Sequence, residues 1–267
     1  MLILKYDGLD AERHRLDALT GGESLAGFGH ALTLISHYAA TGQVRFRAPY
    51  SRDVRFYFTG SRDGSLEWVI QTVANHPEAI ALGLGANGLS ALVAYVFNRA
   101  IGREPDTDLR EIEKLDGARS GDLEALIEAV EPSVRRAHRV IGSSAAEITL
   151  FDPERPAARA YFDRTSKDYL ENDLNGGIST QDVSVGALNV NSRYGRAFFA
   201  DLGRTVPFKV AREAHPRTMT ELSRGINNYA KKNGLTVSIR FMKILAVDDR
   251  LKRVIIYDAY HLESDDR

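Results

Sequence analysis

The most suggestive spacing in the sequence is a run of three glycines, Gly83, Gly85 and Gly88, which spells the G-x-G-x-x-G of a dinucleotide-binding turn. Such a turn works only inside a βαβ unit, whose second strand ends on an acidic residue that holds the ribose. The pattern of residues 89–101 stays helical, and a loop at 104–106 follows with no strand before it. We therefore expect no cofactor, and we interpret the glycines as small residues that let a helix approach its neighbour.

The same segment has a second interpretation. Residues 79–97 form a run of nineteen residues without a charge, which is about the length that spans a bilayer. Three glycines weaken a helix, so we expect buried helices of a soluble protein here. The alternative is a segment over residues 79–101 that inserts into a membrane or drives oligomerisation.

The remaining candidates for chemistry are isolated. His30 and His37 lie seven residues apart, whereas metal-binding pairs on helices usually lie four apart. His138 ends a basic helix and is expected on a solvated face or as a partner of the helix dipole, and Asp248 with Asp249 forms a hairpin turn. The sequence contains no recognisable triad or metal motif, so we expect no metal site, and an enzyme is the less favoured function.

Composition indicates a globular protein with a polarised charge. The 267 residues are 43% hydrophobic and 27% charged, with no cysteine and a net charge of −1. Without cysteine there is no disulfide or thiolate metal site, and the start of the chain does not resemble a signal peptide, so we expect a cytoplasmic protein. Residues 106–185 carry a net −7 and residues 186–267 a net +6, a contrast that favours mutual attraction or separate partners.

Periodicity predicts an α+β domain over residues 1–171, with a strand-helix-strand layer at 1–75 and a helical extension at 78–142. In the layer, Gly42 ends a predicted helix that starts near Gly22 or Ser24. Pro132 is expected to break the extension. The predicted strands of this domain are 2–6, 14–19, 44–48, 54–60, 65–74 and 147–151.

A polar, glycine-rich linker is expected at 172–181, followed by a small barrel at 182–264. Three strands, a helix and two strands follow in the order β-β-β-α-β-β of an OB-fold. The apolar alternation slips by one at Gly186-Ala187, as a β-bulge would produce, and small barrels need bulges to close. An SH3-like barrel and an open α+β sandwich are the alternatives.

The second barrel strand suggests a ligand surface. If Ala197 and Phe199 point inward, Arg196 and Phe198 point outward on the face that OB-folds use for oligonucleotides. An outward aromatic ring beside arginines suits base stacking with phosphate contact. The alternative is that this basic surface docks on the acidic region 106–131. The complete set of candidate binding residues is Arg193, Tyr194, Arg196, Phe198, Arg204 and Lys209.

Two stretches resemble a group of uncharacterised bacterial proteins that carry domains of unknown function. They are KYDGLDAERHRLDA…ESLAGFGHAL with RDGSLEWVI, and KDYLEND…SVGALNVNSRYGRAFFADLGRTVPF. The resemblance covers most of the chain and implies no catalytic residues. We expect a non-enzymatic binding or assembly protein, with single-stranded nucleic acid, another protein or a second copy of the chain as its partner. A membrane-acting effector and an enzyme with a site between the domains are the alternatives.

Overall fold

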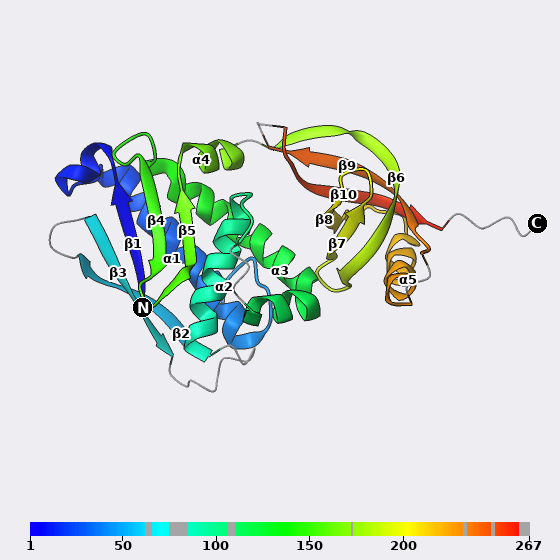
Figure 1. Cartoon of the computed structure of the whole chain (residues 1–267), viewed down its shortest axis with the longest axis horizontal. Coiled ribbons are helices and arrows are strands. Elements are labelled where there is room, and N and C mark those ends of the chain that lie inside the picture. The colour runs from blue at the N-terminus through cyan, green and yellow to red at the C-terminus, as the bar shows by residue number, and fades with distance from the viewer. Residues whose placement is uncertain are drawn as a thin grey trace, which may run out of the picture. The chain divides into compact units, whose positions relative to one another are not determined.

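The computed structural model describes residues 1–61, 66–74, 85–105, 110–171, 173–231, 234–246 and 249–261. The chain divides into two compact units (Figure 1). The first, here called the N-terminal unit, contains Met1–Asp116 and Leu126–Glu171. The second, here called the barrel unit, contains Gly117–Ala125 and Asn172–Arg267. The long helix α3 (Arg110–Ala137) therefore contributes to both units.

The N-terminal unit is built on an antiparallel sheet with strand order β2-β3-β1-β4-β5. Four of its strands agree with the predicted ones, but the predicted strands at 14–19 and 44–48 are wrong. Residues 14–17 instead lead into a helix, and 44–48 lie in a loop. The strand at β5 was not predicted. The strands are β1 (Leu2–Asp7), β2 (Val54–Ser61), β3 (Leu66–Ala74), β4 (Glu147–Asp152) and β5 (Arg155–Phe162).

Helix α1 (Ala18–Thr41) is the predicted first helix, and it begins at Ala18 and not near Gly22 or Ser24. Its cap is Asp17, whose carboxylate accepts a 2.8 Å hydrogen bond from the backbone N–H of Thr20. Gly42 ends the helix in the left-handed conformation, with φ of 67°. The other helices of this unit are α2 (Gly85–Ala100), α4 (Arg164–Glu171), the short η1 (Leu9–Arg13) and η3 (His138–Val140), and part of α3.

Three phenylalanines join these helices to the sheet. Phe28 of α1, Phe97 of α2 and Phe162 of β5 are fully buried, and their ring centroids lie 5.3–5.6 Å apart in tilted or edge-to-face pairs. Apolar residues from three separate parts of the chain thus form one core on one face of the sheet.

The predicted break at Pro132 is wrong, because α3 runs through it to Ala137. A proline removes one helical hydrogen bond, so packing must compensate for the loss if the helix is to continue. Val130 and Val134 on either side of Pro132 are fully buried. Gly27 of α1 lies so close that a Cβ there would be 2.6 Å from the Ser133 carbonyl oxygen. Tertiary contact therefore outweighs the local preference of the proline.

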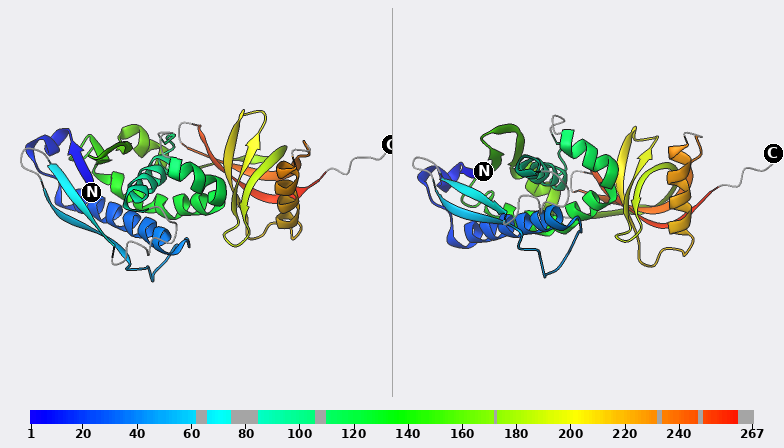
Figure 2. Two further views of the ribbon diagram at one scale, coloured as in Figure 1. Left: turned by 60° about the horizontal axis from the view of Figure 1, so that its bottom comes forward. Right: turned by 90° about the horizontal axis from the view of Figure 1, so that it is seen from below.

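The barrel unit forms a closed barrel with strand order β10-β8-β7-β6-β9 (Figure 2). The small barrel expected in this part of the chain is thus present. The β8–β10 pair is parallel and the other pairs are antiparallel. The predicted bulge is confirmed, because the β6–β7 register shifts between Val185 and Ala187. The elements are β6 (Leu174–Asn189), β7 (Tyr194–Phe199), β8 (Arg204–Val210), α5 (Thr218–Ala230), β9 (Val237–Leu245) and β10 (Leu251–Tyr260).

Most of the expected linker at 172–181 is strand instead. Strand β6 begins at Leu174, which pairs with Leu245 of β9. The glycine pair Gly176-Gly177 falls at a register shift between Asn175 and Ile178. The glycines therefore mark an irregularity in a long strand, where the backbone approaches its partner closely, and not a flexible connection.

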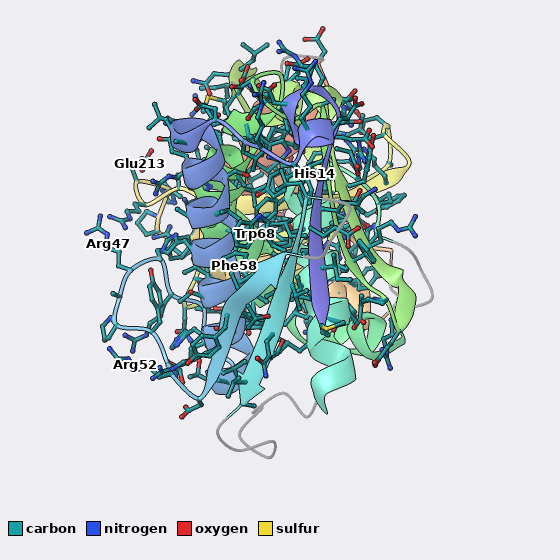
Figure 3. All side chains as sticks on the ribbon, turned by 90° about the vertical axis from the view of Figure 1, so that its left-hand side faces the viewer. His14, Arg47, Arg52, Phe58, Trp68 and Glu213 are labelled. Atoms are coloured by element: carbon teal, nitrogen blue, oxygen red, sulfur yellow. The ribbon has the colours of Figure 1, made fainter. Side chains whose placement is uncertain are left out.

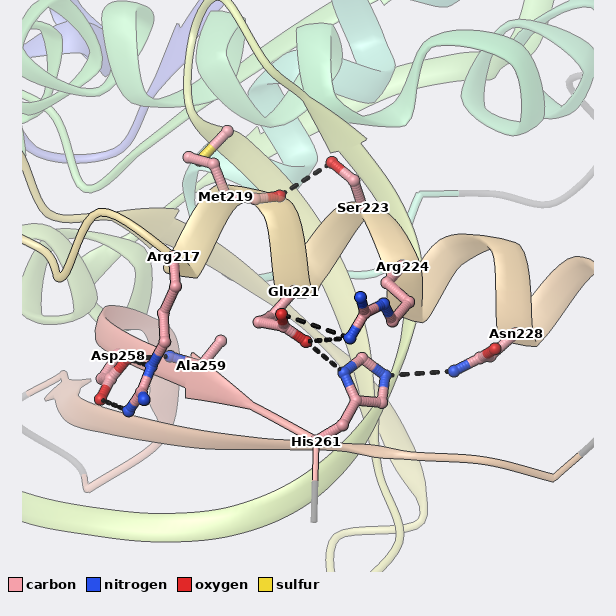
Figure 4. Close-up of polar contacts among 9 residues, drawn as sticks. All are labelled: Arg217, Met219, Glu221, Ser223, Arg224, Asn228, Asp258, Ala259 and His261. Atoms are coloured by element: carbon pink, nitrogen blue, oxygen red, sulfur yellow. Dashed lines mark hydrogen bonds and ion pairs between the residues drawn. The ribbon is translucent and has the colours of Figure 1, made fainter. Parts of the chain in front are cut away.

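Helix α5 is tied to β10 and the residue after it by polar contacts (Figure 4). Arg217 and Asp258 form a bidentate ion pair, in which the guanidinium donates to the two carboxylate oxygens at 3.1 and 2.6 Å. His261 contacts Glu221 through Nδ1 at 2.6 Å and Asn228 through Nε2 at 3.1 Å. These contacts attach the last described residues of the chain to the barrel.

No helix within the described ranges is long and apolar enough to cross a membrane. Of the proposed membrane segment 79–101, residues 79–84 lie outside the described residues, as does Gly83 of the glycine motif. Gly85 and Gly88 lie in the first turn of α2.

Candidate functional site

The six candidate residues lie on and around two neighbouring strands, β7 and β8. Along β7 the side chains of Ala197 and Phe199 enter the barrel core, and those of Arg196 and Phe198 lie on the outer face. Across the strands Tyr194 faces Lys209, Arg196 faces Pro207 and Phe198 faces Thr205. We call these three cross-strand pairs the β7–β8 face. Arg193 precedes this face and Arg204 starts β8 at its other end.

At the Tyr194 end of the face the side chains are already engaged. Tyr194 begins β7 and is only 5% exposed. The ammonium group of Lys209 lies 5.1 Å from the centre of its ring, a cation–π contact. Arg193 has a left-handed backbone, with φ of 66°, and its guanidinium donates to the carbonyl of Ala211. This end of the face is organised by contacts within the barrel unit.

Arg196 points outward but is covered by the acidic segment of α3, residues 117–125. Its Nε lies 3.3 Å from Oε1 of Glu124, and the two side chains are 17% and 5% exposed. A Cβ on Gly121 would be 2.8 Å from the carbonyl oxygen of Tyr194, so the helix backbone lies directly on the strand. Asn189 of β6 donates to the carboxylate of Asp122 in the same segment. The contact is of the kind expected if the basic surface docks on region 106–131.

At the opposite end the face is open. Phe198 is 42% exposed, and Thr205 across from it is exposed as well. Arg204 is exposed and donates one 3.1 Å hydrogen bond to the carbonyl of Leu251, which holds its guanidinium beside β10. The nearby Asp201 carboxylate accepts a 2.5 Å hydrogen bond from Gln181. The open end thus presents an aromatic ring and a positioned cation.

A solvated face was one of two positions expected for His138, and it is wrong because the side chain is buried. It is 1% exposed and packs edge-on against Phe162, with ring centroids 5.3 Å apart. Its Nδ1 lies 2.7 Å from the Val134 carbonyl oxygen, which can only accept, so Nδ1 carries the proton, and Nε2 lies 2.9 Å from the Ser166 hydroxyl oxygen. Burial lowers the pKa of His138 to about 4. The imidazole is therefore neutral at pH 7.

The other predicted polar residues occupy structural positions. His30 and His37 both lie on α1 and flank the ring of Tyr50 at 5.9 and 6.1 Å. Asp249 has a left-handed backbone in the turn between β9 and β10, and Asp248 lies outside the described residues. Across the parts of the chain that the structure describes, no group of three or more His, Cys, Asp or Glu residues could hold a metal ion.

One polar cluster was missed because β5 was not predicted. The hydroxyl of Tyr161 donates to Glu147, and this bond, with burial, raises the pKa of the tyrosine to about 12. Arg103 lies 5.0 Å from the centre of the Tyr161 ring and forms a 2.8 Å ion pair with Asp163. The bonds hold the tyrosine in its protonated form, which suits positioning and not nucleophilic attack. The β-prone pair Tyr161-Phe162 was the available signal, and Pro156 obscured it.

Comparison with known protein families gives two matches. Residues 2–171 match a domain of unknown function, DUF7946, and residues 178–260 match a family of unknown function, DUF7947. No curated protein and no solved structure matches the chain. The first match ends at the last residue of α4, and the second lies within the barrel unit. The predicted resemblance to proteins with domains of unknown function is thus confirmed, and the chain belongs to the DUF7946 family, with a DUF7947 region after it.

Proposed function

We propose that the barrel is an OB-like binding domain and that its β7–β8 face binds single-stranded nucleic acid. Three features support an OB-like assignment: the strand order, the helix between the third and fourth strands, and the parallel pairing of the third strand with the fifth. In OB-folds the second and third strands, which correspond to β7 and β8, carry the oligonucleotide face. A non-enzymatic binding protein follows from this assignment.

The observation that carries the proposal is the exposed ring of Phe198 at the open end of that face. An exposed aromatic ring on a sheet offers a platform on which a base stacks regardless of its identity. Arg204 pairs across the strands with Phe199, next to Phe198, and its exposed guanidinium is held at the Leu251 carbonyl at this end of the barrel, where we expect it to meet a phosphate of the bound strand. The ligand therefore enters at the Phe198 end.

The acidic segment of α3 limits how far the ligand extends. Glu124 forms an ion pair with Arg196, which lies two residues from Phe198 on the same side of β7. A carboxylate at this position competes with phosphate for the same guanidinium. A strand of nucleic acid that runs along the whole face has to displace Glu124, whereas a short contact at the open end does not.

Binding of a labelled oligothymidylate to the full chain tests the proposal, followed by fluorescence anisotropy over a range of salt concentrations. We expect Phe198→Ala to weaken binding about 5- to 100-fold, the loss of one stacked base. Arg204→Gln should reduce the salt dependence by about one phosphate contact, a slope change of roughly 0.7. Glu124→Gln should tighten binding, because it removes the charge that neutralises Arg196.

Tyr229→Ala is the matched control for loss of an aromatic ring. Tyr229 is 58% exposed and lies on helix α5, which is not part of the β7–β8 face. Equal affinities of wild type, Phe198→Ala and Glu124→Gln would refute the proposal. A loss of binding in Tyr229→Ala equal to that in Phe198→Ala would show that the face is not specific.

A further inference from the structure

The N-terminal unit carries a second basic surface, on the loop after α1 and the strand that follows it. Residues 43–58 contain four arginines and no lysine, with Asp53 as the single acidic residue. Aromatic residues lie between the arginines in the sequence VRFRAPYSRDVRFYF. The four arginines, with Phe46 and Tyr57, are here called the arginine loop surface, and the arginines are Arg45, Arg47, Arg52 and Arg55.

The loop is held in place by contacts at the end that leads into β2. The backbone N–H of Ser51 donates a 2.8 Å hydrogen bond to Nδ1 of His37 on α1. Tyr50 packs its ring between His30 and His37, and its hydroxyl lies 3.3 Å from Nε2 of His30. Arg45 donates to the Pro49 carbonyl at 3.3 Å across the loop. The base of the loop is thus fixed on the helix while its outer side remains in solvent.

The cationic groups and two rings face outward. All four arginines are exposed, and Phe46 and Tyr57 are 51% and 44% exposed. Figure 3 shows Arg47 and Arg52 on the outer side of the loop, pointing away from α1. Arg55 lies on β2 and donates to the Arg52 carbonyl at 3.3 Å, which joins the strand and the loop into one surface.

Three of the four arginines of this surface lack a carboxylate partner in the part of the chain that the structure describes. Among the described residues, Arg45, Arg47 and Arg55 form no ion pair with a carboxylate, and Asp53 accepts a hydrogen bond from Ser51 at 2.6 Å. Elsewhere in the unit, cations do pair, as Arg139 does with Glu23 at 2.6 Å. A cluster of like charges at short range is unfavourable by itself and attracts an anionic partner.

We propose that the arginine loop surface binds the backbone of single-stranded nucleic acid, with Phe46 and Tyr57 as stacking platforms. Guanidinium groups bind phosphate through two parallel hydrogen bonds and stack on bases, which lysine does not do. Arg55 and Tyr57 lie two residues apart on the same side of β2, at a spacing of about 6.6 Å. Cation and ring therefore alternate along the surface, as phosphate and base alternate along a strand.

Charge placement favours nucleic acid over a lipid surface. Phe46 is the single phenylalanine of the loop at residues 43–53, and an arginine lies on each side of it. The loop thus has no contiguous apolar tip of the kind that enters a bilayer. This site lies entirely in the N-terminal unit and does not depend on the barrel face.

The test uses the full chain, a labelled oligothymidylate and anisotropy at several salt concentrations. Arg47→Gln with Arg55→Gln removes two charges, and we expect about tenfold weaker binding at low salt. The slope of log affinity against log salt should fall by roughly 1.4, since each phosphate contact on a single strand contributes roughly 0.7. Phe46→Ser should weaken binding by about fivefold or more and leave the slope unchanged, because a lost stacking contact releases no counterions.

Arg13→Gln with Arg15→Gln is the matched control. Both arginines are exposed in the same unit, and their replacement changes the net charge by the same amount. This control should bind within about twofold of wild type. If it weakens binding as much as the loop variant, or if the loop variant binds like wild type, the inference is overturned. Far-ultraviolet circular dichroism verifies that each variant is folded.

Two further comparisons separate this site from others. The Arg47→Gln and Arg55→Gln changes are also combined with Phe198→Ala to distinguish the two faces. If the loop changes weaken oligonucleotide binding and Phe198→Ala does not, this inference is supported even though the barrel proposal fails. Sedimentation with vesicles of phosphatidylserine and phosphatidylcholine tests the lipid alternative. Loop-dependent binding to vesicles without loop-dependent binding to the oligonucleotide would overturn the assignment to nucleic acid.

Discussion

The burial of His138 predicts a steep loss of stability of the N-terminal unit in mild acid. The pKa of this imidazole falls from 6.5 to about 4, mainly because burial disfavours the charged form. Below pH 6.5 the unfolded chain binds a proton that the folded chain does not. Stability from this group is therefore complete above about pH 6.5 and is lost as the pH falls toward 4.

The magnitude follows from the gap between the two pKa values. At about 1.4 kcal/mol per pH unit, the difference between 6.5 and about 4 corresponds to about 3 kcal/mol. Since a domain is typically stable by about 5–15 kcal/mol, this loss is large enough to measure. His138→Asn removes the titrating group and keeps a donor near the Val134 carbonyl, so its stability should depend less on pH.

Urea unfolding at pH values from about 4 to 7.5, followed by tryptophan fluorescence, measures this difference. The chain has one tryptophan, Trp68, on β3 of the N-terminal unit, so the signal reports that unit. Between these pH values wild type should lose about 3 kcal/mol more than His138→Asn. Ser166→Ala, which retains the buried imidazole, should keep the steep profile. Parallel profiles of wild type and His138→Asn would refute the reasoning.

Two further substitution pairs test packing and charge. Gly27→Ala should destabilise the N-terminal unit by about 2 kcal/mol or more, because the added Cβ would overlap the α3 backbone. Gly22→Ala should stabilise the unit by about 0.5 kcal/mol, because no atom lies within 4 Å of the added Cβ. Urea unfolding measures both changes, and equal effects would contradict the close helix contact. Asp173→Asn should destabilise the barrel unit by about 2 kcal/mol, because Asp173 lies 2.6 Å from the ammonium of the buried Lys252. Asp168→Asn, in an exposed pair, should change stability by less than about 0.5 kcal/mol, and thermal unfolding followed by circular dichroism compares the two.

The barrel was largely predictable because its signals are local. Alternation along residues 196–199 placed Ala197 and Phe199 inside and Phe198 outside, and the slip at Gly186-Ala187 marked the bulge. Each of these signals depends on neighbours within a few residues, so sequence alone carries it. The start of β6 was missed because Gly176 and Gly177 resemble a linker until the pairing with β9 is known.

The candidate site was only partly predictable. Outward orientation of Arg196 follows from the strand period, but its ion pair with Glu124 joins residues far apart in the chain. The same holds for the close approach of α3 at Gly121 to the backbone carbonyl of Tyr194. The opposite net charges of residues 106–185 and 186–267 indicated attraction between them, but they did not determine which acidic residue pairs with which basic residue.

Sequence by itself determined the elements with strong periods and clear punctuation: α1 with its Gly42 end, the alternating barrel strands and the exposed ring of Phe198. Tertiary structure alone decided that α3 continues through Pro132, that His138 is buried and neutral, and that Glu124 covers Arg196. The physical reason is that local preferences amount to less than about 1 kcal/mol for most residues and about 3 kcal/mol for a proline inside a helix, whereas each large side chain buried between distant segments contributes about 2–5 kcal/mol. Where the two disagree, the distant contacts prevail.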